Sequence, residues 1–390
     1  MWIKHLSFSA KKITGLSSLA ILVSLAGCTQ PTETGQGETD PSAGASELPQ
    51  VVATTSVLCD LTQQIAQDTV ALTCLVEAGQ DPHTYVANPS DRRAIDEADL
   101  VLYDGYDATP ELIQIVEASS NPAPKVAVYE AAVPEPLMAE AHDHGHDHED
   151  DLEHEAAKHS KAEASHSEDH AHDEHDHAHD EHDHAEETHE DEHAHEATEG
   201  EAALAPDPHI WHQALNNGKM AEVIATKLLA INPDQADFYR QNAEQLATQF
   251  SALDTWIKAQ AATVPVANRK LVSTHEAFNY FADAYGFKVE VALSGLSTDE
   301  KPSAARLTEL VDAVKASGVP AIFAETTSNT KLIETLANDA KVVVAENPLF
   351  VEGPGGPGTS AETIQTMLVV NTCTVVNALG GACAEAEAPL

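Results

Sequence analysis

The feature that most constrains the fold is an alternation of short β-rich runs and helical patterns, which occurs twice along the chain. The first series begins at Gln50, and its β-rich runs are VVATT, VALTCLV, DLVLY and KVAVY. The second series begins near Lys270, and its runs are KLVS, KVEVAL, PAIFAE and KVVVA. Short β-rich runs separated by helical patterns indicate βαβ units and a parallel sheet. We therefore predict an α/β protein with two (βα)4-like lobes.

A helical stretch from Asn216 to about Thr263 separates the two series, with a break at Asn232-Pro233. Its second piece has apolar residues at helical spacing and would extend roughly 40 Å at 1.5 Å per residue. This piece is either one more packed helix or a rigid helix that joins two lobes. We adopt the second interpretation. It gives an N-terminal lobe over residues 50–233, a linking helix over 234–263 and a C-terminal lobe over 264–390.

The first 27 residues have the order of a secretory signal, with the cationic MWIKHLSFSAKK followed by the apolar ITGLSSLAILVSLAG. The run ends in LAGC, which resembles the bacterial lipobox, so we predict that Cys28 becomes the lipidated first residue of the mature protein. The alternative is an ordinary signal peptide with a chance cysteine. Residues 28–49 are rich in Gly, Thr, Pro and Glu and suit a flexible tether. We expect a periplasmic or otherwise extracytoplasmic protein that a lipid anchors at the membrane.

An acidic segment at residues 140–201 interrupts the first lobe and holds seventeen of the 22 histidines. It lacks the apolar content that would offset the entropy of ordering, so we predict a disordered insertion. We expect it to bind metal loosely at many places, for capture, sensing or delivery of zinc; a solvated acidic linker is the alternative. The histidines that we assign to this secondary binding are His142, His144, His146, His148, His170, His172, His175, His177, His179, His182 and His184. The formal net charge of −44 argues against nucleic acid as a partner.

Four histidines remain outside the signal peptide and the insertion, and three of them follow a predicted strand or the insertion. His83 lies in DPHTY, His209 in DPHIW, and His275 in STHEAF at a strand-to-helix junction. Ligands of open α/β sheets bind at the carboxyl ends of strands. In both DPH sequences proline stiffens the backbone before the imidazole, and the aspartate can accept a nearby N–H. The fourth, His212, lies three residues after His209 and competes with it for the role of metal ligand. We interpret His212 as a residue behind the ligands or as incidental.

The ordered set GQDPHTYVANPSD, DPHIWH, THEAFNYF and LFVEGPGGPGTSAETIQTMLVVNT resembles the metal-binding receptors of bacterial ABC importers, specifically the ZnuA-type zinc-uptake branch. The resemblance covers nearly all of the chain after the tether, and the His-rich insertion is itself a mark of that branch. It implies one metal ion held between two lobes by four side chains: His83, His209, His275 and a carboxylate. The family's usual aspartate is replaced here by Glu352, and Glu346 is the substitute candidate.

Three imidazoles favour zinc over manganese, because imidazole suits Zn²⁺ whereas carboxylate suits Mn²⁺. The resemblance also implies that the manganese branch usually has Glu at the position of His275. A site of three nitrogens and one oxygen is normal for tetrahedral Zn²⁺. The resemblance therefore implies a monomeric receptor, not an enzyme, that captures Zn²⁺ and delivers it to an ABC permease in the inner membrane. A manganese receptor, a His-rich zinc storage or chaperone protein, and a metalloenzyme are the alternatives.

Four cysteines remain after Cys28, and none forms a CxxC pair, so we do not expect a thiolate zinc cluster. An even number of cysteines in an exported protein suggests disulfides, but sequence alone does not fix their pairing. Cys59 opens a predicted helix and Cys74 lies in the next strand, so a local disulfide is feasible. Cys373 and Cys383 lie in and just beyond the last predicted helix and are candidates for another.

Overall fold

The structure is a computed structural model that describes residues 48–140, 204–273, 276–292 and 303–390. The predicted signal peptide, Cys28, the secondary histidines of the insertion and His275 lie outside these residues. None of the helices in the described ranges combines the length and the apolar character that crossing a bilayer requires.

The first strand–helix series forms a sheet of four strands with the order β2-β1-β3-β4. All of its neighbouring strands run parallel, as expected for strands joined by helical crossovers. The strands are β1 (Gln50–Ala53), β2 (Ala71–Cys74), β3 (Leu100–Tyr103) and β4 (Lys125–Ala127). The helices of this series are α1 (Ser56–Ala66), α2 (Pro89–Glu97), α3 (Pro110–Ala118) and α4 (Val128–Ala132).

The central strands β1 and β3 are buried on both faces, which explains why they are almost continuously apolar. Val52 and Val101 share one buried cluster with Leu112 of α3. Val51 lies on the opposite face and belongs to a second cluster, which includes Leu58 of α1. Successive strand residues point to opposite faces, so a single four-residue strand contributes to both clusters.

The second series repeats the same strand order in a less regular form. Strand β7 pairs in parallel with β8, and β9 pairs in parallel with β10. The amide of Phe323 donates to the Val272 carbonyl at 3.2 Å and links the two pairs, so the neighbours follow the order β8-β7-β9-β10. These strands are β7 (Lys270–Ser273), β8 (Lys288–Ala292), β9 (Ala321–Ile322) and β10 (Val343–Val344). The helices are α7 (Asn279–Tyr285), α8 (Ala304–Ser317), α9 (Thr330–Ala340) and α10 (Ile364–Ala378).

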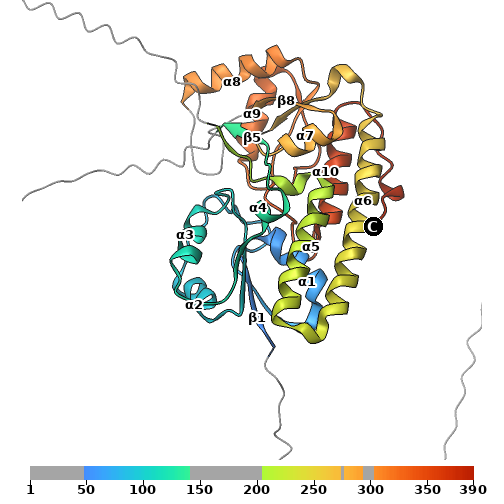
Figure 1. The fold of residues 1–390 in the computed structure, drawn as a ribbon. Coiled ribbons are helices and arrows are strands. Elements are labelled where there is room, and N and C mark those ends of the chain that lie inside the picture. The colour runs from blue at the N-terminus through green and yellow to red at the C-terminus, as the bar shows by residue number, and fades with distance from the viewer. Residues whose placement is uncertain (1–47, 141–203, 274–275, 293–302) are drawn as a thin grey trace, which may run out of the picture. The chain divides into compact units, whose positions relative to one another are not determined.

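Two long helices lie between the series, α5 (Ala214–Ile231) and α6 (Ala236–Ala261), and they pack along each other (Figure 1). A short 3₁₀ turn, Pro233–Gln235, separates them at the predicted break. Helix α6 also contacts α1 of the first series and α10 of the second. The largest buried cluster accordingly includes Leu58, Phe250 and Leu368 together. The linking helix is therefore also part of a continuous core, and the lobe boundaries drawn from the sequence stay a prediction.

Several element boundaries differ from those predicted. Strand β4 ends at Ala127, before the end of the predicted run KVAVY, because α4 begins at Val128. Helix α10 begins at Ile364, where Thr363 forms a capping box with Thr366. Strands β9 and β10 have only two residues each. The sequence also gave no sign of β5 (Met138–Glu140) and β6 (Leu204–Pro206), which pair antiparallel. In this pair Glu140 and Leu204, the residues that flank 141–203, lie opposite each other.

The structure contains both cysteine pairs that the sequence left open. Cys59 is bonded to Cys74 and ties α1 to β2, across a separation of 15 residues. Cys373 is bonded to Cys383 and ties α10 to the segment that follows it. The first bond lies at the strand whose following loop carries His83, so it helps to fix the base of that loop.

Candidate metal centre

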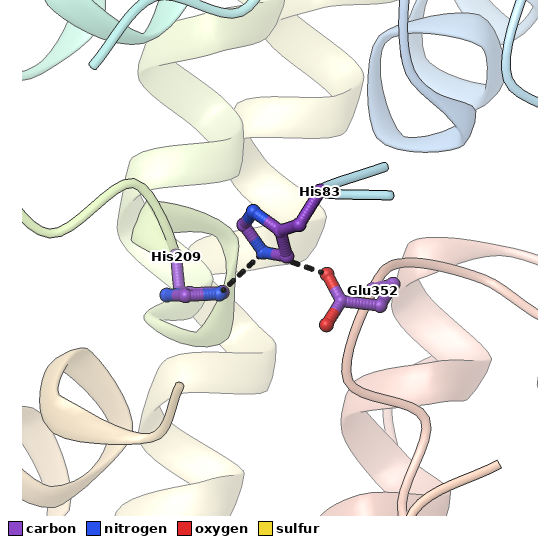
Figure 2. Close-up of side chains that lie close together, drawn as sticks. All are labelled: His83, His209 and Glu352. Carbon is purple, nitrogen blue, oxygen red and sulfur yellow. Dashed lines mark hydrogen bonds and ion pairs between the residues drawn. The ribbon is translucent and has the colours of Figure 1, made fainter. Parts of the chain in front are cut away.

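Three of the four predicted ligands, His83, His209 and Glu352, come together in the structure (Figure 2). One ligand atom from each lies within 4.8 Å of the other two. They arrive on three different connections: His83 follows β2, His209 follows β6, and Glu352 follows β10. His275 lies outside the described residues, two positions after the end of β7, and its role as a ligand stays a prediction.

The spacing of these atoms suits a tetrahedral ion. His83 Nε2 lies 3.3 Å from His209 Nε2 and 3.4 Å from Glu352 Oε2. A tetrahedral Zn²⁺ ion with metal–ligand bonds of about 2.05 Å separates its ligand atoms by about 3.3 Å. Two edges of the cluster therefore already have the length that such an ion would impose. Within the described residues, no other group of three or more His, Cys, Asp or Glu side chains has this kind of geometry.

The loop that carries His83 is held at both ends. The backbone N–H of His83 donates to Asp81 Oδ1 at 2.9 Å. Further along, Asn88 caps α2 in a capping box with Asp91. The hydroxyl of Tyr85 donates to Asp91 at 2.9 Å, and burial together with the Asp91 carboxylate raises the pKa of Tyr85 to about 12. The phenol therefore stays protonated and continues to donate to Asp91, which ties the His83 loop to α2.

Asp207 fixes the orientation of the fully buried His209. Its Oδ1 atom accepts the backbone N–H of His209 at 2.9 Å and lies 2.8 Å from the ring Nδ1. Asn279 of α7 donates to the other carboxylate oxygen at 3.1 Å. Burial raises the pKa of Asp207, but the hydrogen bonds and positive charge of His209 outweigh burial, so the pKa is lowered. An ionised Asp207 on Nδ1 directs Nε2 toward the cluster, as carboxylates behind ligand histidines do in metal sites.

The two DPH sequences thus have the same local geometry, which confirms the predicted role of their aspartates. In each, the aspartate two residues before the histidine accepts that histidine's backbone N–H at 2.9 Å. Asp207 additionally reaches the imidazole, which the sequence did not reveal. The two sequences share the turn, so the sequence alone does not distinguish the aspartate that also reaches the ring.

Glu352 is buried in the cluster, whereas the substitute candidate Glu346 is exposed and lies outside it. Side chains from two helices hydrogen-bond to the backbone of the loop that carries Glu352. Asn371 of α10 accepts from the Phe350 amide at 2.9 Å and donates to the Phe350 carbonyl at 2.6 Å. Ser56 donates to the carbonyl of Glu352 itself at 3.4 Å. The extra methylene of Glu relative to Asp therefore does not keep this carboxylate from the two histidines.

His212 does not point into the cluster. Its Nε2–H donates to the Val351 carbonyl at 3.0 Å, and its ring lies against Phe278 with the ring centres 4.5 Å apart. Complete burial lowers the pKa of His212 to about 3, so the ring is neutral. Of the two interpretations of His212, a residue behind the ligands or an incidental one, this position fits the first, because the ring bonds to Val351 and not to the cluster.

The glycine after Glu352 allows the segment to approach the first series closely. Gly353 has a φ of +125°, a backbone conformation that residues with a side chain rarely adopt. A Cβ atom at this position would lie 2.3 Å from Ser56 Oγ at the start of α1. The first glycine of GPGGPG is therefore needed both for its backbone angle and for the contact that brings Glu352 to His83.

Comparison with known proteins places the chain among metal receptors. The ZnuA model, described as zinc-uptake complex component A, periplasmic, matches residues 51–378. The manganese-binding lipoprotein MntA of Halalkalibacterium halodurans is 27% identical over 361 residues, which are 93% of this chain and 96% of that protein. The zinc-binding protein TroA of Treponema pallidum is 27% identical over 342 residues, 86% of this chain and 91% of TroA.

A solved structure gives the same result for the fold. The periplasmic zinc-binding protein TroA from Treponema pallidum superposes with a TM-score of 0.64 at 26% sequence identity. The match covers 85% of this chain and 99% of that chain. The predicted α/β class is thereby confirmed.

Proposed function

We propose, because the chain belongs to the ZnuA family of periplasmic zinc-uptake components, that it is the zinc-binding receptor of an ABC importer. It captures Zn²⁺ outside the cytoplasm and delivers the ion to a permease in the membrane. A lipid on Cys28 holds it at the membrane surface. The family relationship supports a metal receptor of this class, and the choice of zinc is our inference from the ligands.

The observation that carries the proposal is the convergence of His83, His209 and Glu352 from three separate connections. Two of them are buried, and the Asp207 carboxylate fixes which nitrogen of His209 faces the cluster. Surface ion pairs form without such support, whereas metal-ligating histidines are normally oriented by a carboxylate or carbonyl on the other ring nitrogen. The cluster is therefore best explained as a cation site.

Zinc is favoured by the donor atoms. With His275 as the fourth ligand, the site has three imidazole nitrogens and one carboxylate oxygen, a set that suits Zn²⁺ better than Mn²⁺. The two ligand–ligand distances near 3.3 Å support a small tetrahedral ion. A manganese receptor is the second candidate, because MntA, a relative over 93% of this chain, is named for manganese.

Four protein ligands close the coordination sphere, which suits transport better than catalysis. Catalytic zinc sites keep one position for water or substrate, whereas closed sites hold the ion. Release then requires that Glu352 and His275 separate from His83 and His209. The histidines of the insertion form loose secondary sites that raise the local supply of zinc.

Stoichiometry tests the proposal. Residues 141–203 are replaced by an Asn-Gly turn, which suits the antiparallel pairing of Glu140 with Leu204. The protein is equilibrated with equal zinc and manganese, dialysed, and analysed for bound metal. We expect one zinc per chain, and none after His83→Ala in the same background.

Two outcomes contradict the proposal in different ways. Retained manganese in place of zinc would support the manganese receptor. Loss of all tight metal on deletion of the insertion would support a storage or chaperone protein whose main sites lie in that segment.

A further inference from the structure

We propose that His212 is a positioning residue for the Glu352 ligand, acting through the carbonyl of Val351. The turn Ile210–His212, which directly follows His209, would then hold two ligands of the metal site as one unit. This inference rests on the proposed function, because it assumes that His209 and Glu352 bind the ion.

The Val351 carbonyl accepts two hydrogen bonds from this turn. The indole Nε1–H of Trp211 and the Nε2–H of His212 both donate to it at 3.0 Å. Val351 and His212 are fully buried and Trp211 is nearly so, so water does not compete for these bonds. The residue that follows the doubly bonded carbonyl is Glu352.

These two bonds join residues 350–353, the loop that carries Glu352, to the turn that follows His209. Ser56 reaches the Glu352 carbonyl from α1 at 3.4 Å, which is close to the limit for a hydrogen bond. Asn371, which holds Phe350, belongs to α10 and therefore to the same series as Glu352. Trp211 and His212 thus hold the residue before Glu352 next to the turn that carries His209.

The same two side chains also connect to His209. The rings of Trp211 and His209 pack edge to face with centres 5.3 Å apart. The amide of His212 donates to the His209 carbonyl at 3.4 Å within the turn. A shift of the turn would therefore move one imidazole ligand and the anchor of the carboxylate ligand together.

The role requires a donor at the position of Nε2. The packing of the His212 ring against Phe278 sets the direction of the Nε2–H bond. Leucine keeps the volume but has no donor. Glutamine carries an N–H₂ group the same number of bonds from Cα as Nε2, so it can restore the bond to Val351.

The test uses the full chain and measures zinc affinity by competition with a chelator that keeps free Zn²⁺ below the range of loose sites. His212→Leu should weaken zinc binding by about tenfold or more, as removal of outer-sphere support does in other metal sites. His212→Gln should stay within about threefold of wild type. Trp211→Phe removes the second donor and gives an independent variant if His212→Leu does not fold; it should weaken binding in the same direction.

A double-mutant cycle with Glu352→Gln decides whether His212 acts through Glu352. In that background His212→Leu should weaken zinc binding by less than about threefold, because the carboxylate that it positions is gone. An equal loss in both backgrounds, or wild-type affinity of His212→Leu, would overturn the inference while leaving the metal site intact. Wild-type affinity of Glu352→Gln would instead overturn the ligand assignment itself, and the inference with it.

Discussion

The Nε2 atoms of His83 and His209 lie 3.3 Å apart, although the two residues are 126 positions apart in the sequence. Two ring nitrogens at this distance form a hydrogen bond or bind a cation that lies between them. The Asp207 carboxylate occupies the Nδ1 side of His209 and directs Nε2 toward His83. The site is thus arranged so that a divalent ion can replace the contact between the two rings.

Loss of either imidazole should remove tight zinc binding. His83→Ala and His209→Ala each remove one ligand of the proposed four-ligand site, and we expect the affinity to fall by at least about 100-fold. Chelator competition on the variant without residues 141–203 measures this directly. Val86→Ala, at an exposed position on the His83 loop, is the matched control and should bind like wild type. Unchanged affinity in both histidine variants would contradict the assignment.

Asp207→Asn should weaken zinc binding by about 10- to 100-fold without changing the stoichiometry. Asparagine can still accept the His209 backbone N–H but no longer offers a charged acceptor to Nδ1. Asp81→Asn is the matched control, because Asp81 accepts the corresponding backbone N–H of His83. We expect a clearly smaller loss there, and equal losses at both positions would refute the orienting role of Asp207.

Gly353→Ala should destabilise the fold by about 2 kcal/mol or more, from an unfavourable backbone angle and the clash with Ser56. Gly358→Ala separates the two effects, because Gly358 also has a positive φ, +85°, but an added Cβ would meet no atom within 4 Å. Denaturant unfolding should therefore show a smaller loss for Gly358→Ala. Similar losses in both variants would mean that the approach of Gly353 to Ser56 contributes nothing.

Asp60 should make stability depend on pH. Burial raises the pKa of its carboxyl to about 6, although the Ile364 amide and Gln64 donate to it. A raised folded-state pKa means that the stabilisation is present below the unfolded value near 4 and is lost as the pH rises through about 6. The wild type should therefore lose stability relative to Asp60→Asn as the pH rises. The unfolding free energy of Asp60→Asn minus that of wild type should increase by up to about 3 kcal/mol between pH 4 and 7. A pH-independent difference in urea unfolding would exclude this effect.

The sequence predicted most elements because their local signals agree with the fold. Asn88 with Pro89 marks the start of α2, and apolar runs mark strands that are buried on both faces. Strands β5 and β6 were missed because they have three residues each and pair across 63 intervening positions. No local pattern indicates such a pairing.

The sequence indicates which residues belong to the candidate site better than it indicates how they are arranged in space. His83 and His209 are identified by their repeated DPH context, and the family resemblance adds Glu352. The choice between Glu352 and Glu346 depends on a loop that is held by long-range contacts, among them the one with Ser56, almost 300 positions away. The bond from His212 to Val351 is a long-range contact of the same kind, so the sequence could not separate a positioning residue from an incidental one.

The measurement that tests the central claim most directly is a crystal structure of the zinc-loaded protein, with anomalous scattering data recorded on both sides of the zinc absorption edge. The account predicts one strong peak about 2.0–2.2 Å from His83 Nε2, His209 Nε2, a carboxylate oxygen of Glu352 and a ring nitrogen of His275. A zinc peak away from His83 and His209, with these two histidines still in contact with each other, would contradict it.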